Sequence, residues 1–123
     1  MINLMPIVSY RDLEVWQKAM DLVAAVYAVA GQFPREELYG LVAQMKRAAV
    51  SIPSNIAEGH RRASRRQYVY FLNIAFGSGA ELETQIEVAK RTEWGRGLDF
   101  ATIDGYLNEV MRMLNVLIRK LAA

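Results

Sequence analysis

Apolar residues recur at three- and four-residue steps in four successive stretches of the chain, and this helical period constrains the fold more than any other sequence feature. No stretch alternates β-branched and polar residues as a strand would. The stretches are joined by short connections, which favour antiparallel neighbours. We therefore predict an all-α protein, an antiparallel up-down-up-down four-helix bundle. Residues 1–123 would form a single domain, with residues 1–10 as an extended N-terminal segment.

The first two predicted helices follow from their apolar stripes and end signals. Asp12 can cap the first helix, which ends at Ala30. Its predicted core stripe is Leu13, Trp16, Met20, Val23, Tyr27 and Ala30. The second helix is predicted to begin with Pro34 in its first turn and to end at Gly59, with Pro53 causing a bend but no break. Its predicted core stripe is Leu38, Leu41, Met45, Ala48, Ile52 and Ile56.

The third predicted helix is capped by Ser64 and its stripe continues to Ala89. Gly77 and Gly79 lie in its middle, where each glycine costs about 1 kcal/mol relative to alanine. We expect both to allow close approach of a neighbouring helix. Residues 94–97 form the clearest loop, and a fourth helix is predicted from about Asp99 onwards.

Polar residues interrupt the second helix at helical steps, between small apolar residues that leave little room for a charged exterior. With three residues of the third helix they form a predicted structural polar network: Gln44, Arg47, Ser51, Asn55, Glu58, Ser78, Glu81 and Gln85. We expect a buried ion pair of Arg47 with Glu58 or Glu81, whose loss would cost about 3–5 kcal/mol. A small-molecule pocket is the alternative, and it predicts a cavity beside Asn55 and Ser78.

Basic residues surround the turn that follows this stripe. The candidate nucleic-acid-binding residues, beside His60, are Arg61, Arg62, Arg65 and Arg66. Net charge is +2 overall, whereas residues 44–66 carry +5 and the remainder −3. Arginine suits phosphate oxygens because its planar group donates in pairs. The alternative is a solvated helix end, where basic residues near a C-terminus favour the helix dipole. Both interpretations stay open.

Two further features of the sequence are weaker candidates. The first is a second basic cluster of Lys90, Arg91 and Arg96, interleaved with Trp94. Trp94 could be an exposed anchor for a partner, but we favour a buried tryptophan that closes one end of the bundle. The second is Tyr68 with Tyr70, which could stack on bases, although Tyr68 is in phase with the core and is expected to pack there.

Composition argues against catalysis and membrane insertion. The chain has no cysteine and one histidine, so we predict no metal site and no cofactor. Glu81 and Glu83 point to different helix faces and form no acid–base pair, and we predict no enzymatic activity. The longest apolar run, residues 22–30, is far shorter than the roughly 20 residues of a membrane span. The start does not resemble a signal peptide, so we expect a cytoplasmic protein without a membrane partner.

These motifs together resemble the 23S rRNA intervening-sequence proteins. The pattern SIPxNIAEG followed by ELETQ is the most specific part of the resemblance, which extends over nearly the whole chain. The residues that carry it are Leu13-Glu14-Val15-Trp16, Phe33-Pro34, Gln44, Arg47-Ala48-Ala49-Val50-Ser51-Ile52-Pro53, Asn55-Ile56-Ala57-Glu58-Gly59, Phe71-Leu72, Ile74-Ala75, Gly77-Ser78 and Glu81-Leu82-Glu83-Thr84-Gln85. The chain departs from the family pattern at Gly79, where a large apolar residue is usual, and in residues 1–8.

The resemblance implies a four-helix bundle that assembles into a ring, a homopentamer, without enzymatic activity. Founding genes of the family lie in insertions within 23S ribosomal RNA genes. A related protein, the accessory variability determinant of diversity-generating retroelements, binds nucleic acid and a reverse transcriptase through basic surface. Our leading hypothesis is thus an oligomeric module that binds the RNA or DNA backbone. The alternative is a protein-binding adaptor or scaffold, with a partner such as a reverse transcriptase and no nucleic acid.

Overall fold

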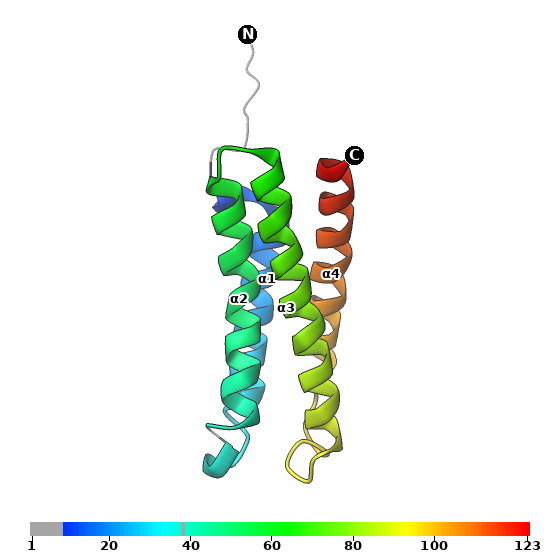
Figure 1. Cartoon of the computed structure of the whole chain (residues 1–123). Helices are drawn as coiled ribbons and strands as arrows, with labels where there is room; N and C mark the ends of the chain where they lie inside the picture. The colour runs from blue at the N-terminus through cyan, green and yellow to red at the C-terminus, as the bar shows by residue number, and fades with distance from the viewer. Residues whose placement is uncertain (1–8, 38) are drawn as a thin grey trace.

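The computed structural model describes residues 9–37 and 39–123, and its regular elements are all helices (Figure 1). Four α-helices are preceded or separated by two short 3-10 helices. In chain order the elements are η1 (Tyr10–Asp12), α1 (Glu14–Ala30), η2 (Arg35–Glu37), α2 (Leu41–Arg61), α3 (Arg65–Arg91) and α4 (Ala101–Ala122). No strand occurs in the described ranges, and the all-α class with four helices is confirmed.

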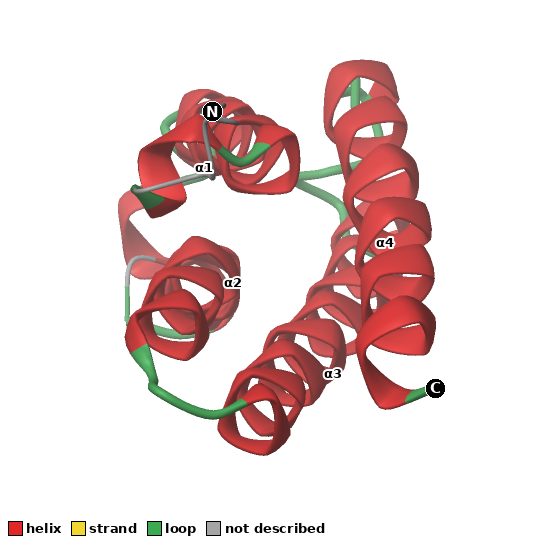
Figure 2. Cartoon of the chain, turned by 90° about the horizontal axis from the view of Figure 1, so that it is seen from above, coloured by secondary structure: helices red, strands yellow, loops and turns green. Residues whose placement is uncertain are grey.

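The four helices stand side by side, and each packs against two neighbours. Seen from above, α1 lies beside α2 and α4, and α3 closes the arrangement by contacting α2 and α4 (Figure 2). Residues 62–64 join α2 to α3 at the end of the molecule where the C-terminus also lies (Figure 1). We call this the turn end. The connections 31–40 and 92–100 lie at the opposite end, which we call the loop end (Figure 1).

The core consists of large aliphatic side chains drawn from all four helices. The largest fully buried residues are Leu22, Val26, Val42, Met45, Ile52, Ile56, Leu72, Leu82, Ile86, Ile103, Val110 and Leu114. The predicted stripe of α2 is confirmed from Met45 to Ile56, and α4 buries Ile103, Leu107 and Leu114. Burial of these side chains is the main force that holds the helices together.

The predicted core stripe of α1 is largely wrong. Val15, Ala19, Leu22, Val26 and Val29 face the core, displaced by one residue from the prediction. The sequence did not discriminate between the two stripes because α1 is apolar on most of its circumference. The predicted stripe instead lies along the outside of α1, where its central residues are partly or largely exposed: Trp16, Met20, Val23 and Tyr27.

The start of α1 differs from the prediction. Leu13 is the N-cap of α1, and it makes no side-chain cap hydrogen bond; Asp12 belongs to η1. Ser9 caps η1 by accepting a hydrogen bond from the backbone N–H of Arg11. Ser9 itself is extended, whereas residues 1–8 of the predicted extended segment lie outside the described residues.

The second helix also begins later than predicted. α2 starts at Leu41, and Pro34 instead precedes the 3-10 turn η2. The predicted stripe residue Leu38 lies outside the described residues. The helix continues without a break through Pro53, as predicted, and ends at Arg61, two residues after Gly59.

Three helical glycines have different roles. A Cβ atom on Gly59 would lie 2.8 Å from Cβ of Phe71, so this residue allows α2 and α3 to approach closely at the turn end. Gly79 has the predicted role, because the side chain of Met111 from α4 fills the space that its Cβ would need. The prediction for Gly77 is wrong, since a Cβ there would meet nothing within 4 Å.

Candidate functional site

The turn end brings the four candidate arginines together from two helices. Arg61 is the last residue of α2, Arg62 is its C-cap, and Arg65 and Arg66 begin α3. The reversal is fixed by Ser64, whose hydroxyl oxygen accepts a hydrogen bond of 3.1 Å from the backbone N–H of Gln67. This confirms the predicted cap and holds the first turn of α3 in place beneath its arginines.

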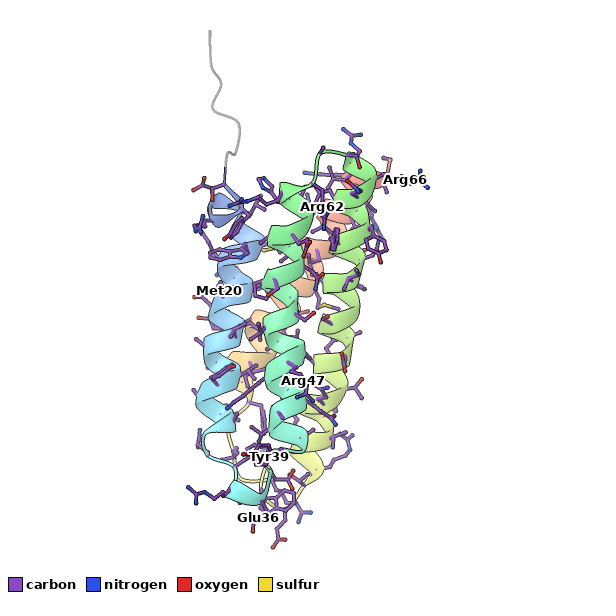
Figure 3. The ribbon with its side chains drawn as sticks, turned by 60° about the vertical axis from the view of Figure 1, so that its left-hand side comes forward. Met20, Glu36, Tyr39, Arg47, Arg62 and Arg66 are labelled. Atoms are coloured by element: carbon purple, nitrogen blue, oxygen red, sulfur yellow. The ribbon has the colours of Figure 1, made fainter. Side chains whose placement is uncertain are left out.

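These arginines are not equivalent in their contacts. Arg62 forms an ion pair with Glu58 one helical turn earlier, and its guanidinium lies 4.8 Å from the centre of the Phe71 ring. The guanidinium of Arg61 lies 5.5 Å from the centre of the Tyr10 ring. Arg65 and Arg66 are exposed, and neither forms an ion pair within the described part of the chain. Figure 3 shows Arg62 and Arg66 at the turn end.

The position of Arg65 and Arg66 weakens the interpretation as a solvated helix end. That interpretation requires basic residues near a helix C-terminus, where the helix dipole favours positive charge. Arg61 has such a position in α2, but Arg65 and Arg66 are in the first turn of α3, which contains no acidic residue. The dipole disfavours positive charge there. Their placement is therefore an electrostatic cost to the fold.

Further cations reach the turn end from parts of the chain far from residues 61–66. Arg11 belongs to η1, which contacts α2, and Arg119 and Lys120 are in the last turn of α4 near the C-terminus (Figure 1). Sequence reasoning missed these three residues because none is part of a local basic run. The signal that could have found them is the predicted antiparallel order of the helices, which would return the end of the fourth helix to the turn between the second and third.

Two tyrosines border the turn end. Tyr68 is half-buried, as its phase predicts, and burial raises the pKa of its phenol; its ring meets that of His60 edge-on at 5.8 Å. Tyr70 is 62% exposed, so one aromatic face next to the arginines is accessible to solvent. Tyr70 also contacts Phe71 edge-on, with 5.2 Å between ring centres.

The predicted polar network exists only in its central part. The hydroxyl oxygens of Ser51 and Ser78 lie 2.8 Å apart and join α2 to α3. Asn55 donates to the backbone oxygen of Ser51 at 2.8 Å and to its hydroxyl at 3.0 Å, and Gln85 donates weakly to Glu81 at 3.4 Å. These side chains link neighbouring turns and the two helices.

The expected buried ion pair of Arg47 is wrong. Arg47 and Glu58 are exposed, Glu58 pairs with Arg62, and Glu81 is exposed as well. The stripe faces outward along the seam between α2 and α3, since the large aliphatic residues of both helices take the interior. Gln44 is exposed for the same reason.

A small cavity does lie along this stripe. It has a volume of about 290 Å³ and is lined by Gln44, Arg47, Ala48, Ser51, Ser78 and Glu81. The small-molecule interpretation predicted a cavity beside both Asn55 and Ser78, and only Ser78 lines this one. Gln85 is buried nearby along α3, and its Oε1 atom has no hydrogen-bond partner among the described residues.

The second basic cluster is largely neutralised by acidic partners. Lys90 lies 2.8 Å from Asp104 and 3.3 Å from Glu87, and Arg91 lies 2.9 Å from Glu87. The hydrogen bonds from Arg91 and Lys90 lower the pKa of Glu87, and the hydrogen bond to Asp104 raises the pKa of Lys90.

Trp94 is exposed, contrary to the prediction of a buried tryptophan. Its exposed fraction is 41%, and the loop end is closed instead by Phe100, which is 5% exposed. The neighbouring Gly95 is buried and packs closely against the end of α3, because a Cβ there would lie 2.0 Å from the backbone oxygen of Ala89.

The described residues offer neither a metal site nor a membrane span. No group of three or more His, Cys, Asp or Glu side chains there could hold a metal ion. Within the same residues, every helix is too short or too polar to cross a membrane.

Comparison with known proteins identifies the family of this chain. The sequence pattern of the 23S rRNA-intervening sequence proteins matches residues 11–116 of this chain. The chain belongs to this family. Its fold is similar to a crystal structure from Bacteroides thetaiotaomicron, described as a protein with unknown function from the S23 ribosomal protein family. That similarity has a TM-score of 0.76 at 24% identity, and it covers 85% of this chain and 95% of the other. None of the curated proteins matches the chain.

Proposed function

We propose that this family member is a non-enzymatic nucleic-acid-binding module of the cytoplasm, an antiparallel up-down-up-down bundle that assembles into a ring-like homopentamer. Its turn end contacts the phosphate backbone of RNA or DNA. The observation that carries the proposal is the pair Arg65 and Arg66 in the first turn of α3, exposed and without an ion pair in the described residues. Because two arginines at this position destabilise the fold electrostatically, binding of an anionic ligand is the function that best accounts for them.

The contacts of the arginines support a division of roles. Arg62 is paired with Glu58 and packed on Phe71, so it holds the end of α2 in place. Arg61, Arg65 and Arg66 can each donate to phosphate oxygens, which position a nucleic acid without reading its bases. Exposed Tyr70 adds a face on which an unpaired base could stack.

Assembly into a ring needs two different contact surfaces on each subunit. Exposed apolar residues on two helices are available for this. Ile74 and Val88 are exposed on α3, and Val116 is exposed on α4 beside a cavity of about 400 Å³ that Val15, Met113 and Leu117 help to line. A ring would repeat the basic turn end around one axis and thereby strengthen binding of a long polyanion.

The test compares two triple variants in a nucleic-acid binding assay. Fluorescence anisotropy of structured RNA and duplex DNA is measured across a salt series for wild type, for Arg61, Arg65 and Arg66 changed to glutamate, and for Arg35, Arg91 and Arg96 changed to glutamate. Each variant changes the net charge by the same amount. We expect only the turn-end variant to lose binding, because it removes three phosphate contacts. On duplex DNA each lost contact should reduce the slope of log binding constant against log salt concentration by about 0.9.

Two controls make this result decisive. Circular dichroism and oligomer mass must match wild type, and Arg62 stays unchanged because its ion pair supports the fold. Equal losses in both triple variants would reduce the effect to net charge and contradict a site at the turn end. Absence of binding by the intact wild-type oligomer at low salt would overturn the nucleic-acid proposal as a whole.

Exposed Trp94 favours a second candidate function, docking of a protein partner such as a reverse transcriptase at the loop end. Tryptophan is enriched among residues that dominate protein interfaces. A protein that stays bound after ribonuclease treatment and is lost with Trp94→Ala would support this adaptor role. A partner lost on ribonuclease treatment would instead be held through nucleic acid.

A further inference from the structure

A wide groove runs along the outside of α1 and α2, separate from the polar stripe and from the exposed arginines of α3. Its volume is about 890 Å³, and its wall is mostly apolar, with charged residues only toward the turn end. The lining residues on α1 and α2 are Trp16, Met20, Val23, Val50, Pro53, Ser54, Ala57, Glu58, Arg61 and Arg62, and Tyr10 of η1 completes the wall. Figure 3 shows Met20 on this face of α1.

The groove leaves part of a second apolar stripe of α1 uncovered, although Trp16 and Val23 of this stripe also pack against the core. Met20 is 43% exposed and Val50, opposite on α2, is 40% exposed, while Trp16 and Val23 are only half-buried. Contiguous apolar surface of this kind commonly marks the place where another segment binds. The chemistry of the wall requires an occupant that is mainly apolar.

One such segment precedes the groove directly in the chain. Residues 1–8, MINLMPIV, contain a single polar residue, Asn3, and no charged side chain. They lead into Ser9 and Tyr10, and Tyr10 lies at the rim of the groove. Its ring meets that of Trp16 edge-on at 5.3 Å and lies under the guanidinium of Arg61 at 5.5 Å. The segment therefore leaves the described part of the chain at the mouth of the groove.

The length of the segment also fits. Eight extended residues span about 26 Å. The apolar floor from Trp16 to Val23 covers eight helical residues, about 10 Å of helix. A segment tethered this closely has an effective local concentration on the order of millimolar, which favours its own groove over that of another molecule.

We propose that residues 1–8 bind in the α1–α2 groove of their own chain, with Ile2, Leu4, Met5 and Ile7 as the candidate contacts to the apolar wall. The N-terminal segment then covers Met20 and Val50 and shields Trp16 from solvent. The bound segment occupies the groove that a second copy or a foreign peptide would otherwise take, and it leaves Arg65 and Arg66 exposed. The inference does not depend on nucleic-acid binding.

Cysteine crosslinking tests the location, since the natural chain contains no cysteine. Leu4, Met5 or Ile7 is changed to cysteine singly, each together with Val50→Cys, and the full-length proteins are mildly oxidised. The control pairs combine the same N-terminal substitutions with Val116→Cys on α4, which is 48% exposed. We expect a disulfide within one chain for at least one Val50 pair, with a yield independent of protein concentration, and none for the Val116 pairs.

Two outcomes of this experiment would overturn the proposal. Disulfides between two chains would mean that the segment of another copy occupies the groove. Val50 pairs that crosslink no better than the Val116 pairs would mean that residues 1–8 do not bind there, and that a partner takes the groove.

Fluorescence gives a second readout that needs no crosslink. In a Trp94→Phe background Trp16 is the single tryptophan, and Ile2, Leu4, Met5 and Ile7 are changed together to serine. We expect quenching of Trp16 by acrylamide to rise at least twofold, and an excess of a peptide with the sequence of residues 1–8 to reverse the rise. Unchanged quenching in a variant with wild-type circular dichroism would contradict the proposal.

Discussion

The two ends of the bundle carry similar numbers of charges but use them differently. At the loop end, basic residues are outnumbered by acidic ones and several pairs form. The charged residues there are Arg35, Glu36, Glu37, Glu87, Lys90, Arg91, Glu93, Arg96, Asp99 and Asp104. At the turn end the balance is reversed. The charged residues there are Arg11, Asp12, Glu14, Glu58, Arg61, Arg62, Arg65, Arg66, Arg119 and Lys120.

The contrast is clearest within α3, which has two basic residues at each end. Lys90 and Arg91 are in its last turn, where the helix dipole favours them and Glu87 accepts hydrogen bonds from both. Arg65 and Arg66 are in its first turn, where the dipole opposes them. Lys90 and Arg91 thus contribute to the fold, whereas Arg65 and Arg66 form no ion pair in the described residues and are available to a ligand.

The largest predicted effect concerns backbone approach at the two ends. Gly59→Val should lower the free energy of unfolding by about 1–3 kcal/mol, because the new side chain overpacks against Phe71 and the backbone of Tyr68. Gly97→Val, in open space at the loop end, should change it by less than about 0.5 kcal/mol. Urea denaturation measures both. Equal losses would show that α2 and α3 do not meet closely at Gly59.

Side-chain acceptors at the starts of α3 and α4 provide a second comparison. Ser64 is the N-cap of α3, whereas Asp99 precedes Phe100, the N-cap of α4. Ser64→Ala removes the acceptor for the N–H of Gln67, and Asp99→Ala removes the acceptor for the N–H of Ala101. Ser64→Ala should cost about 1 kcal/mol in urea denaturation because it removes an N-cap. Asp99→Ala should cost about 0.5–1.5 kcal/mol because it removes one hydrogen bond. Only Ser64→Ala should also weaken RNA or DNA binding, since it loosens the turn that carries Arg65 and Arg66. A loss of binding in both variants would argue for a general effect of stability.

Charge reversal on α3 should act in opposite directions at its two ends. Arg65→Glu and Arg66→Glu should each raise the free energy of unfolding by about 0.3–1 kcal/mol, because an acidic residue suits the first turn of a helix. Both should weaken nucleic-acid binding. Arg91→Glu should lower stability and leave binding intact. A stability gain from Arg65→Glu without any loss of binding would remove this residue from the proposed site.

The smallest predicted effect is the pH dependence of the loop end. The folded state lowers the pKa of Glu87 below its ordinary value of 4.5, so its contribution to stability is present above that pH. The contribution is lost as pH falls through the lowered pKa. We expect the melting temperature of wild type to fall more between pH 5 and 3 than that of Glu87→Gln. Coinciding pH profiles would show that these exposed pairs contribute nothing measurable.

Lys90 should behave in the opposite sense. Its pKa is raised above 10.5 in the folded state, so its contribution is complete below that pH and is lost only as pH rises through the higher folded value. The same melting experiment in the alkaline range, with Lys90→Met as the variant, measures this difference. Solvent screening keeps both effects small.

Residue patterns predicted much of the fold because most local signals and the packing agree. The stripe of α2, the Ser64 cap and the loop at 94–97 all follow from period and residue type. The prediction failed for the buried face of α1, because two apolar stripes fit the helical period equally well. The two stripes of α1 have the same spacing and similar apolar content, so only contact with α2 and α4 selects Leu22 and Val26 for the core.

The candidate site was predictable in part. A local run of arginines is visible in any sequence, and its location at one end follows from the turn between two helices. The polar stripe was misjudged because helical phase places Arg47 and Glu58 on one face without saying whether that face is inside. Competition with larger aliphatic residues put them outside, and Glu58 then paired with Arg62.

The sequence by itself determined four helices, their approximate bounds and a basic turn, because helical period and capping act over a few residues. Tertiary structure alone decided which stripe of α1 is buried, which glycine accommodates a neighbouring helix, and which cations gather at the turn end. These properties depend on residues far apart in the chain, such as Gly79 with Met111 and Tyr10 with Arg61. These interactions form only when the helices pack against one another, so a pattern of neighbouring residues cannot predict them.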